Sequence, residues 1–280
     1  MKSLPKTSIN TPSQNHLLNA LPAAERDRLF PHLERVQMTA GDVLYESGGE
    51  LSYAYFPTTC IASLLYITES GATAEIAMVG NEGIIGVALF MSGGTMPNRA
   101  VALSSGHIYR LCKQIFLQEF NRYEALHHLL LRYTQTLITQ MAQTAVCNRY
   151  HSVDQQLCRW LLLNLDRQTG NELILTQEMI ANMLGVRREG ITEAAGKLQR
   201  AELIDYRRGR ITVLDRSGLE ARACECYQVV KNETDRLFPA FWHVPSTAGI
   251  RALNSHASFG VNVSALHIEN PGQENHGWRR

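Results

Sequence analysis

The chain has 280 residues, a formal net charge of +1 at pH 7 and a hydrophobic content of 45%. This length is typical of two domains, and the hydrophobic content suffices for buried cores. The near-neutral charge gives no global indication of a nucleic acid partner. The sequence holds no run of 18 or more apolar residues and its first residues lack an apolar signal core, which together predict a cytoplasmic protein without a membrane partner.

The first part of the chain has the pattern of an all-β domain. Residues 1–15 are polar and predict a disordered tail, and the segment "NHLLNALPAAERDRLFPHLERV" after them has a helical pattern. Short β-branched or aromatic runs then alternate with glycines up to residue 118: "DVLYESGGE", "YAYFP", "IASLLYI", "ESGATAEIAMVG", "NEGIIGVALF" and "RAVALSSGHIYRL". Strands at this spacing predict an antiparallel β-barrel or roll over residues 16–119.

Three glycines in this region, Gly80, Gly83 and Gly86, are spaced like part of a nucleotide-binding fingerprint. That fingerprint requires a strand before it and a helix after it, in a βαβ unit. No helix is predicted directly after Gly86. The three glycines are therefore interpreted as tight turns between strands.

A long helix is predicted from about residue 120 to residue 147, and we expect it to be a dimerisation helix. Its side chains step by four and three, as at the a and d positions of a coiled coil. The expected seam consists of Leu126, Leu130, Tyr133 and Leu137, followed by Gln140, Thr144 and Cys147. A second apolar face holds Leu129, Leu131, Ile138 and Met141. With this second face the helix can also pack against its own barrel, and it can contact the barrel and a twin helix at the same time.

The stretch "LTQEMIANMLGVRREGITEAA", residues 175–195, predicts a helix-turn-helix. Thr176 can cap a first helix, and Gly185 tolerates the positive φ of a sharp turn. Ala181, Gly185 four residues later and Ile191 six residues after that have the spacing of this motif. The exposed start of its second helix enters the major groove of DNA in proteins of this type.

Basic residues gather around and after this motif. Residues 186–210 hold seven Arg or Lys and four acids, a local net charge of +3. The segment "ELIDYRRGRITVLD" predicts a two-stranded wing, with Arg207, Arg208 and Arg210 available to DNA phosphates. With the preceding helix "SVDQQLCRWLLLNLDRQTG" and one more helical stretch at 217–238, it completes a DNA-binding domain over residues 148–238. Residues 239–280 predict a second disordered tail.

The reactive residue types give no enzyme or metal signature. The cysteines lie at positions 60, 112, 147, 158, 224 and 226, without a Cys-x₂-Cys pair, and are expected to be reduced thiols. Cys224 and Cys226 are predicted on nearly opposite faces of one helix, so no metal site and no cofactor are expected. Catalytic Ser-His-Asp, phosphate-loop and paired-carboxylate patterns are also missing, and an enzyme is therefore not expected.

The order of these parts resembles the Crp/Fnr family of bacterial transcription regulators over residues 16–215. The match is most specific in "LTQEMIANMLGVRREGITEAAGKLQRAELI", and "AGDVLYESGG" and "GNEGIIGV" carry it in the roll. The resemblance implies an α+β fold: an N-terminal cyclic-nucleotide-binding-like β-roll, a long dimerisation helix and a C-terminal winged helix-turn-helix. It implies a homodimer on a palindromic operator in double-stranded DNA, with RNA polymerase as a further partner.

The resemblance also implies roles for residues of the recognition helix. Arg188 and Glu189 match the family's guanine-reading arginine and cytosine-contacting glutamate, since arginine pairs with guanine O6 and N7 and glutamate accepts from cytosine N4. Glu193 occupies a third base-reading position that is often arginine, so the operator sequence is not expected to follow the family consensus. The expected backbone contacts are Thr176, Arg187, Thr192, Arg207, Arg208 and Arg210.

The effector pocket of the resembled family is degenerate in this chain. Cyclic-AMP-responsive members carry Gly-Glu-Leu and Arg-Ser motifs, which correspond here to Gly86, Val87 and Ala88 and to Arg99 and Ala100. A ribose or phosphate group left without its partner loses roughly 1–3 kcal/mol. Cyclic AMP is therefore not expected to bind, and the effector is unknown. The cysteine cluster of the family's oxygen sensors is also absent from residues 1–35.

An alternative function is a small-molecule-sensing module that acts on a protein partner. The roll alone would suffice for that function. The predicted helix-turn-helix and its arginine-bearing wing favour DNA binding, because a pure sensor module has no use for them.

Overall fold

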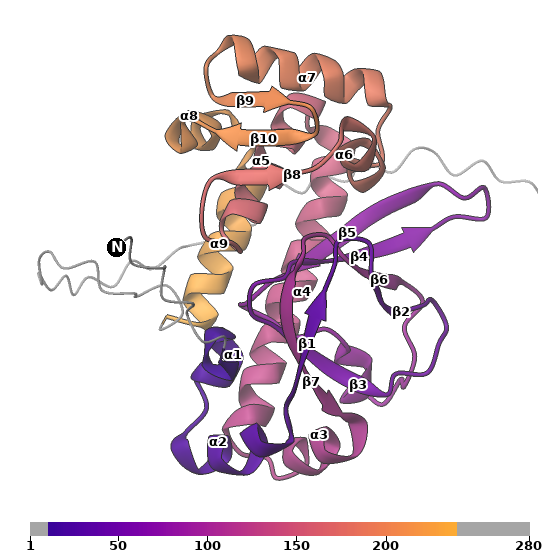
Figure 1. Ribbon diagram of the computed structural model, residues 1–280, viewed down its shortest axis with the longest axis vertical. Helices are drawn as coiled ribbons and strands as arrows, with labels where there is room; N and C mark the ends of the chain where they lie inside the picture. Colours follow the sequence, from indigo (N-terminus) through magenta and orange to yellow (C-terminus); the bar gives the residue numbers. More distant parts are fainter. Residues whose placement is uncertain (1–10, 240–280) are drawn as a thin grey trace, which may run out of the picture. The chain divides into compact units, whose positions relative to one another are not determined.

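The structure is a computed structural model and describes residues 11–239 (Figure 1). The expected tails at 1–15 and 239–280 lie outside this range, except for residues 11–15 and 239. Residues 11–15 are folded: a 3₁₀ turn spans Pro12–Gln14, and Asn15 is fully buried. The Asn15 amide donates to the carbonyl oxygens of Pro57 at 2.9 Å and Gly83 at 2.8 Å, which ties this end of the chain to the roll.

The predicted helical segment consists of short pieces. These are α1 (His16–Asn19), α2 (Ala23–Leu29) and a 3₁₀ turn (Phe30–His32). Pro22 immediately precedes α2, and Pro31 lies in the 3₁₀ turn. Because proline lacks the amide donor of a helix interior, the segment does not form one helix. Its last residues belong to a strand, β1 (Glu34–Met38).

Two antiparallel sheets form the predicted β-roll. The first has the order β1-β7-β3, with β3 at Tyr53–Pro57 and β7 at Gly106–Cys112. The second has the order β2-β6-β4-β5, formed by Val43–Tyr45, Arg99–Ala102, Ala62–Ile67 and Thr73–Val79 respectively. The run "NEGIIGVALF" is not a strand: it includes a 3₁₀ turn at Val87–Leu89. The predicted turn at Gly80 and Gly83 is confirmed by the hydrogen bond from Gly83 N to Gly80 O at 3.1 Å.

The long helix lies against this roll (Figure 1). A separate helix, α3 (Lys113–Phe120), precedes it, so α4 begins at Ala125 rather than at residue 120 and ends at Tyr150. The buried carboxylate of Glu25 accepts hydrogen bonds from the amides of Ala125 and Leu126, each at 3.0 Å, and caps the helix. Near its middle, the Tyr133 ring lies so close to Gly83 that a Cβ on that glycine would overlap it.

The expected dimer seam on α4 is wrong. Leu126, Leu130, Tyr133 and Leu137 are at most 5% exposed and belong to the core of the roll in the same chain. The opposite face of the helix carries Leu131 and Ile138, which are 49% and 58% exposed. Both faces have apolar residues at heptad spacing, and spacing alone does not distinguish an internal partner from a second chain. Of the second apolar face, Leu129 and Met141 pack against the roll core as expected, whereas Leu131 and Ile138 are exposed.

The second half of the described chain forms a winged helix-turn-helix. It begins with α5 (Val153–Leu165), which has a capping box between Ser152 and Gln155. The following elements are β8 (Glu172–Ile174), α6 (Gln177–Leu184), α7 (Arg188–Arg200), β9 (Ile204–Arg207), β10 (Arg210–Val213), α8 (Arg216–Arg222) and α9 (Glu225–Leu237). The strands make a sheet of order β8-β10-β9. The core of this half includes Ile61, Met78 and Leu103 of the roll, so the two halves share buried surface.

One expected helix is divided. The stretch at 217–238 contains both α8 and α9, because Ala223 and Cys224 adopt extended backbone angles between them. Neither glycine nor proline marks this break. Within the described residues, no helix is long and apolar enough to cross a membrane.

Candidate nucleic-acid interface

The predicted helix-turn-helix is confirmed in its local geometry. The Thr176 hydroxyl accepts from the Met179 amide at 3.2 Å and caps α6. Gly185 ends this helix with a φ of +66°, a conformation that strains residues with a Cβ. Ala181 and Ile191 are buried where the two helices meet. The turn therefore fixes the direction in which α7 leaves α6.

The start of α7 presents its polar face outward. Arg187 is the N-cap residue, and Arg188, Glu189, Thr192 and Glu193 are all exposed. The opposite face of α7 is buried through Ile191, Ala194, Ala195 and Leu198. The Arg188 guanidinium is 65% exposed, and its one ion pair among the described residues is with Glu178 at 4.0 Å. A pair this long and exposed restrains the side chain little, so Arg188 can turn to a DNA base.

Thr192 and Glu193, two of the expected DNA contacts on α7, are already engaged within the chain. The Thr192 hydroxyl donates to Gln177 Oε1 at 2.7 Å, which links α7 to α6. Glu193 pairs with Lys197 at 3.0 Å, and Lys197 also reaches Asp154 at 3.2 Å. The hydrogen bond from Lys197 lowers the pKa of Glu193 and keeps this carboxylate ionised. Either residue has to leave its partner before it can contact DNA.

The wing is a hairpin whose turn consists of Arg208 and Gly209, with φ values of +51° and +77°. Two successive positive φ values are typical of the type I′ turn that joins twisted strands. Arg207 pairs with Asp205 at 3.0 Å and Arg210 with Glu172 at 2.5 Å. These ion pairs are exposed and are worth about 0–1 kcal/mol, so a phosphate can replace the carboxylate in each.

A cleft of about 240 Å³ lies between the wing and α7, the expected recognition helix. Its lining consists of Thr176, Gln177, Arg188, Tyr206, Arg208 and Gly209. Two arginines from different elements thus converge beside the amino end of α6, where helix amides favour anions. Gln177 and Tyr206 were not predicted from the sequence. Gln177 could have been inferred as the first residue after the cap, whereas nothing in the sequence singles out Tyr206.

The residues expected at the effector pocket of the roll are mostly buried or paired within the chain. Val87, Ala88 and Ala100 are buried within the roll core. Gly86 precedes the 3₁₀ turn with a φ of +105°. Arg99, the one charged residue of the set, pairs with Glu46 at 3.1 Å. A ligand phosphate would therefore compete with a carboxylate for Arg99, and its ribose would meet apolar side chains.

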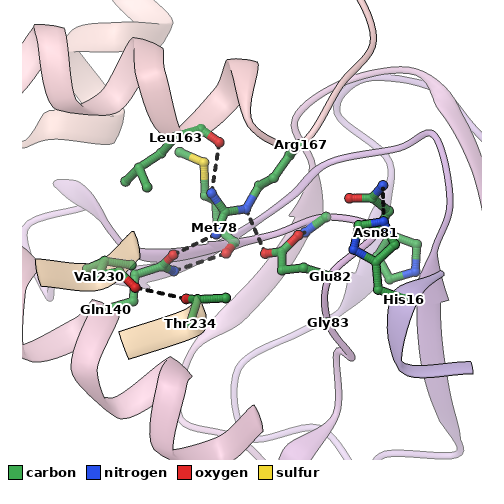
Figure 2. Close-up of polar contacts among 12 residues, drawn as sticks. His16, Met78, Asn81, Glu82, Gly83, Gln140, Leu163, Arg167, Val230 and Thr234 are labelled. Atoms are coloured by element: carbon green, nitrogen blue, oxygen red, sulfur yellow. Dashed lines mark hydrogen bonds and ion pairs between the residues drawn. The ribbon is translucent and has the colours of Figure 1, made fainter. Parts of the chain in front are cut away.

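A buried ion pair connects the roll with the DNA-binding half (Figure 2). Arg167 Nε donates to Glu82 Oε1 at 2.7 Å, and both side chains are only 9% exposed. The same guanidinium donates to Leu163 O at 2.8 Å and to Gln140 Oε1 at 2.9 Å. The Gln140 amide in turn donates to Met78 O at 3.0 Å. The network thus joins the end of β5, α4 and the segment after α5.

A second buried carboxylate, Glu75 on β5, also faces the DNA-binding half. It accepts hydrogen bonds from Trp160 Nε1 of α5 at 2.9 Å and from the Ser63 hydroxyl. Burial raises the pKa of Glu75 to about 7, although both hydrogen bonds and the charges of Arg159 and Arg167 oppose the shift. Neither buried carboxylate was predicted from the sequence, because their partners in the DNA-binding half, Trp160 and Arg167, each lie 85 residues away.

Two family models match the chain. Residues 35–123 match the cyclic nucleotide-binding domain, and residues 155–222 match the Crp-like helix-turn-helix domain. No curated protein matches the sequence.

Solved structures of transcription regulators share the fold. A putative transcriptional regulator of the Crp/Fnr family from Eubacterium rectale is 18% identical with a TM-score of 0.60, over 75% of this chain and 98% of that one. FixK2 from Bradyrhizobium japonicum is 14% identical with a TM-score of 0.59, over 69% and 98%. The c-di-GMP responsive global regulator CLP from Xanthomonas campestris is 14% identical with a TM-score of 0.56, over 69% and 100%. At these identities the likeness shows the fold alone.

Proposed function

This chain belongs to the Crp/Fnr family of DNA-binding transcription regulators, and from this premise we propose that it binds a palindromic operator in double-stranded DNA as a homodimer. The observation that carries the proposal is the exposed, arginine-bearing start of α7 beside the cleft of the wing. A sensor that acts on a protein partner would not need this surface. Family membership also makes the chain a regulator rather than an enzyme.

The proposed contacts divide into two kinds. Arg188 reads a guanine and Glu189 a cytosine in each half-site, with Glu193 next to them on the same face of α7. Thr176, Arg187, Arg207, Arg208 and Arg210 contact phosphates and set the position of the helix in the groove. Thr192 contributes to the backbone contacts only if it releases Gln177. RNA polymerase is retained as a further partner on the family resemblance.

We assign the dimer contact to the exposed face of α4. Leu131, Gln135, Ile138, Ala142 and Ala145 are all exposed and step by four, three, four and three. This is the a/d spacing of a two-stranded coiled coil, in which a second copy of the same helix supplies the complementary side chains. A two-fold axis along this seam would give each dimer two recognition helices, and a palindromic operator matches that symmetry.

We further propose that cyclic AMP is not the effector. The support is the burial of Val87 and Ala100 in the apolar core of the roll and the pairing of Arg99 with Glu46. The roll then either answers to another molecule or serves as a scaffold that leaves the dimer permanently able to bind DNA.

Selection from a pool of random duplexes tests the proposed function. The full chain should enrich a two-fold symmetric sequence with half-site centres about one helical turn apart. The matched control is the Arg188→Ala, Glu189→Ala double variant, whose substitutions are both exposed and should leave the fold intact. The proposal fails if the parent protein enriches no sequence beyond what the double variant enriches at the same salt concentration.

A further inference from the structure

Three thiols and an imidazole meet where the end of α4 faces the start of α9. The four residues are Cys147, His151, Cys224 and Cys226, and one ligand atom of each lies within 4.8 Å of all the others. It is the one such group found between residues 11 and 239. The three cysteines are at most 5% exposed, and they form a buried cluster separate from both apolar cores.

The local structure explains why the four side chains converge. Cys147 lies in the last turn of α4, and His151 four residues later is the residue that ends this helix. Cys224 is the N-cap residue of α9, outside the helix, whereas Cys226 lies in its first turn. The expectation of opposite faces for Cys224 and Cys226 is wrong, because it assumed a continuous helix across the break after α8.

Two of the separations between ligand atoms lie close to the edges of a metal-centred tetrahedron. Cys147 Sγ lies 3.5 Å from Cys224 Sγ, and Cys226 Sγ lies 3.5 Å from His151 Nδ1. A tetrahedral zinc ion with its usual bond lengths sets two sulfurs about 3.8 Å apart and a sulfur and a nitrogen about 3.6 Å apart. Such a compact group suits a single ion. An iron–sulfur cluster would hold thiolates on different irons further apart.

The surroundings of the cluster supply a second, independent observation. His151 Nε2 lies 3.2 Å from the Glu225 carboxylate. A carboxylate on one imidazole nitrogen keeps the proton there and leaves the lone pair of the other nitrogen for a metal, an arrangement common around zinc ligands. In this chain the other nitrogen, Nδ1, is the one that faces Cys226.

A buried cation also lies close by. Arg159 is 4% exposed, and its charge acts on both Cys147 and Cys226. Its Nε has no hydrogen-bond partner among the described residues, although its terminal nitrogen donates to Thr144 at 2.8 Å. Three thiolates, a neutral imidazole and a divalent ion carry one net negative charge, and a buried arginine offsets it.

We propose that Cys147, His151, Cys224 and Cys226 bind one zinc ion, with Nδ1 as the ligand atom of His151. Three thiolates and one imidazole complete the coordination of zinc, so the site is structural and leaves no position open to substrate. Structural zinc contributes directly to folding free energy.

The position of the site indicates which elements the ion would hold together. Residues 151–152 are the whole connection between α4 and α5. Zinc would clamp this connection to α9, the last described helix after the wing, and α9 also meets α4 through the bond from Gln135 to Glu233 at 2.8 Å. The ion would thereby hold the DNA-binding half against the helix to which we assign the dimer contact.

Metal analysis of the full chain tests this proposal without any assay of DNA binding. We expect about one zinc per chain in protein purified without chelators or nickel resin. The Cys226→Ser variant should lose the ion, while Cys112→Ser, which changes a thiol of the roll, should keep it. Replacement by cobalt(II) should give the intense visible bands of tetrahedral cobalt, together with sulfur-to-cobalt charge transfer that Cys226→Ser weakens.

A second variant keeps the test valid if Cys226→Ser does not fold. Glu225→Gln retains all four ligands, and we expect it to bind zinc 10–100-fold more weakly while the shape of its cobalt spectrum stays tetrahedral. The proposal is overturned if the parent chain retains no more zinc than Cys226→Ser, or if its cobalt spectrum is octahedral. A Cys147–Cys224 disulfide in protein kept under reducing conditions would also overturn it, because the pair would then be a redox site.

Discussion

The roll and the winged helix-turn-helix differ in how they hold their expected binding residues. The winged helix-turn-helix, from α5 to α9, is called the reading end below. In the reading end, Arg188 and Glu189 are exposed on a helix whose opposite face is packed. In the roll, Val87 and Ala100 stand at the expected ligand positions and are buried in an apolar core. A polar binding site needs side chains that solvent or ligand can reach, whereas the side chains of an apolar core are excluded from solvent. We therefore propose that the winged helix-turn-helix recognises DNA and that the roll supports it without binding cyclic AMP, and each prediction below tests that division.

The largest expected effect concerns the exposed face of α4, to which we assign the dimer contact and whose other face the roll covers. Leu131→Asp combined with Ile138→Asp should convert the proposed dimer to monomers, because burial of this stripe between two copies would stabilise association by several kcal/mol at about 25 cal/mol per Å². Sedimentation velocity measures the change. Arg132→Glu, an exposed change beside the stripe, should leave the dimer intact. An unchanged dimer in the double variant would rule out this face of α4.

The buried pair between the roll and the reading end gives the next prediction. Glu82→Ala should lower the free energy of unfolding by roughly 3–5 kcal/mol, because it leaves Arg167 buried without its carboxylate. Glu46→Ala removes the partner of Arg99 at an exposed site and should cost about 0–1 kcal/mol. Urea denaturation at one protein concentration compares the two. Equal losses would mean that the roll does not support the reading end through Glu82.

The pH dependence of stability should reveal the second link, Glu75. Its pKa is about 7 in the folded chain and 4.5 in the reference state. A raised carboxyl pKa means that the folded state holds the proton more tightly, so this contribution is complete below about pH 4.5 and is lost as the pH rises to 7. The loss amounts to about 3 kcal/mol at 1.36 kcal/mol per pKa unit.

The Glu75→Gln variant measures this contribution. It lacks the titrating group, so its stability relative to the parent should rise between pH 5 and pH 8. Urea denaturation of both proteins at the two pH values gives the difference. A parallel pH dependence in the two proteins would show that Glu75 does not titrate in this range.

A smaller effect is expected where the reading end contacts DNA. Arg188→Ala should remove the preference for one guanine in each half-site at a cost of roughly 1–3 kcal/mol. Arg207→Ala should weaken binding to all sequences alike and reduce the salt dependence, because the proposed partner of Arg207 is a phosphate. Affinities for the selected operator and for a mismatched duplex separate the two effects. Unchanged discrimination by Arg188→Ala would contradict the assignment of the recognition helix.

The smallest expected effect is the response to cyclic nucleotides, for which we expect none. A ligand that scarcely binds cannot shift the equilibrium between two states of the protein. Calorimetric titration with cyclic AMP and cyclic GMP, followed by DNA binding with and without each, measures this. Micromolar binding with a tenfold gain in DNA affinity would refute the interpretation that the effector pocket is degenerate. It would show that the roll recognises a cyclic nucleotide.

Local features were predictable from the sequence, whereas contacts between distant residues were not. Ala181, Gly185 and Ile191 act within one motif, so their spacing sufficed to predict the helix-turn-helix. On α4, two apolar stripes have the same spacing, and only the position of the roll decides that Leu130 is internal and Ile138 exposed. The pair of Glu82 and Arg167 joins residues 85 positions apart, and neither residue has a local pattern that indicates the other.

The buried contacts of β5 and of the loop after it should affect the rate of the proposed DNA binding. Glu75 is bonded to Trp160, and Glu82 to Arg167, so the reading end is held at two points by one edge of the roll. A reading end held in one orientation relative to the roll does not have to sample other orientations when it meets its operator. Its association rate constant should therefore follow diffusion and electrostatic steering, and fall steeply with salt. Loosening either contact would instead add a slow, salt-independent step to association.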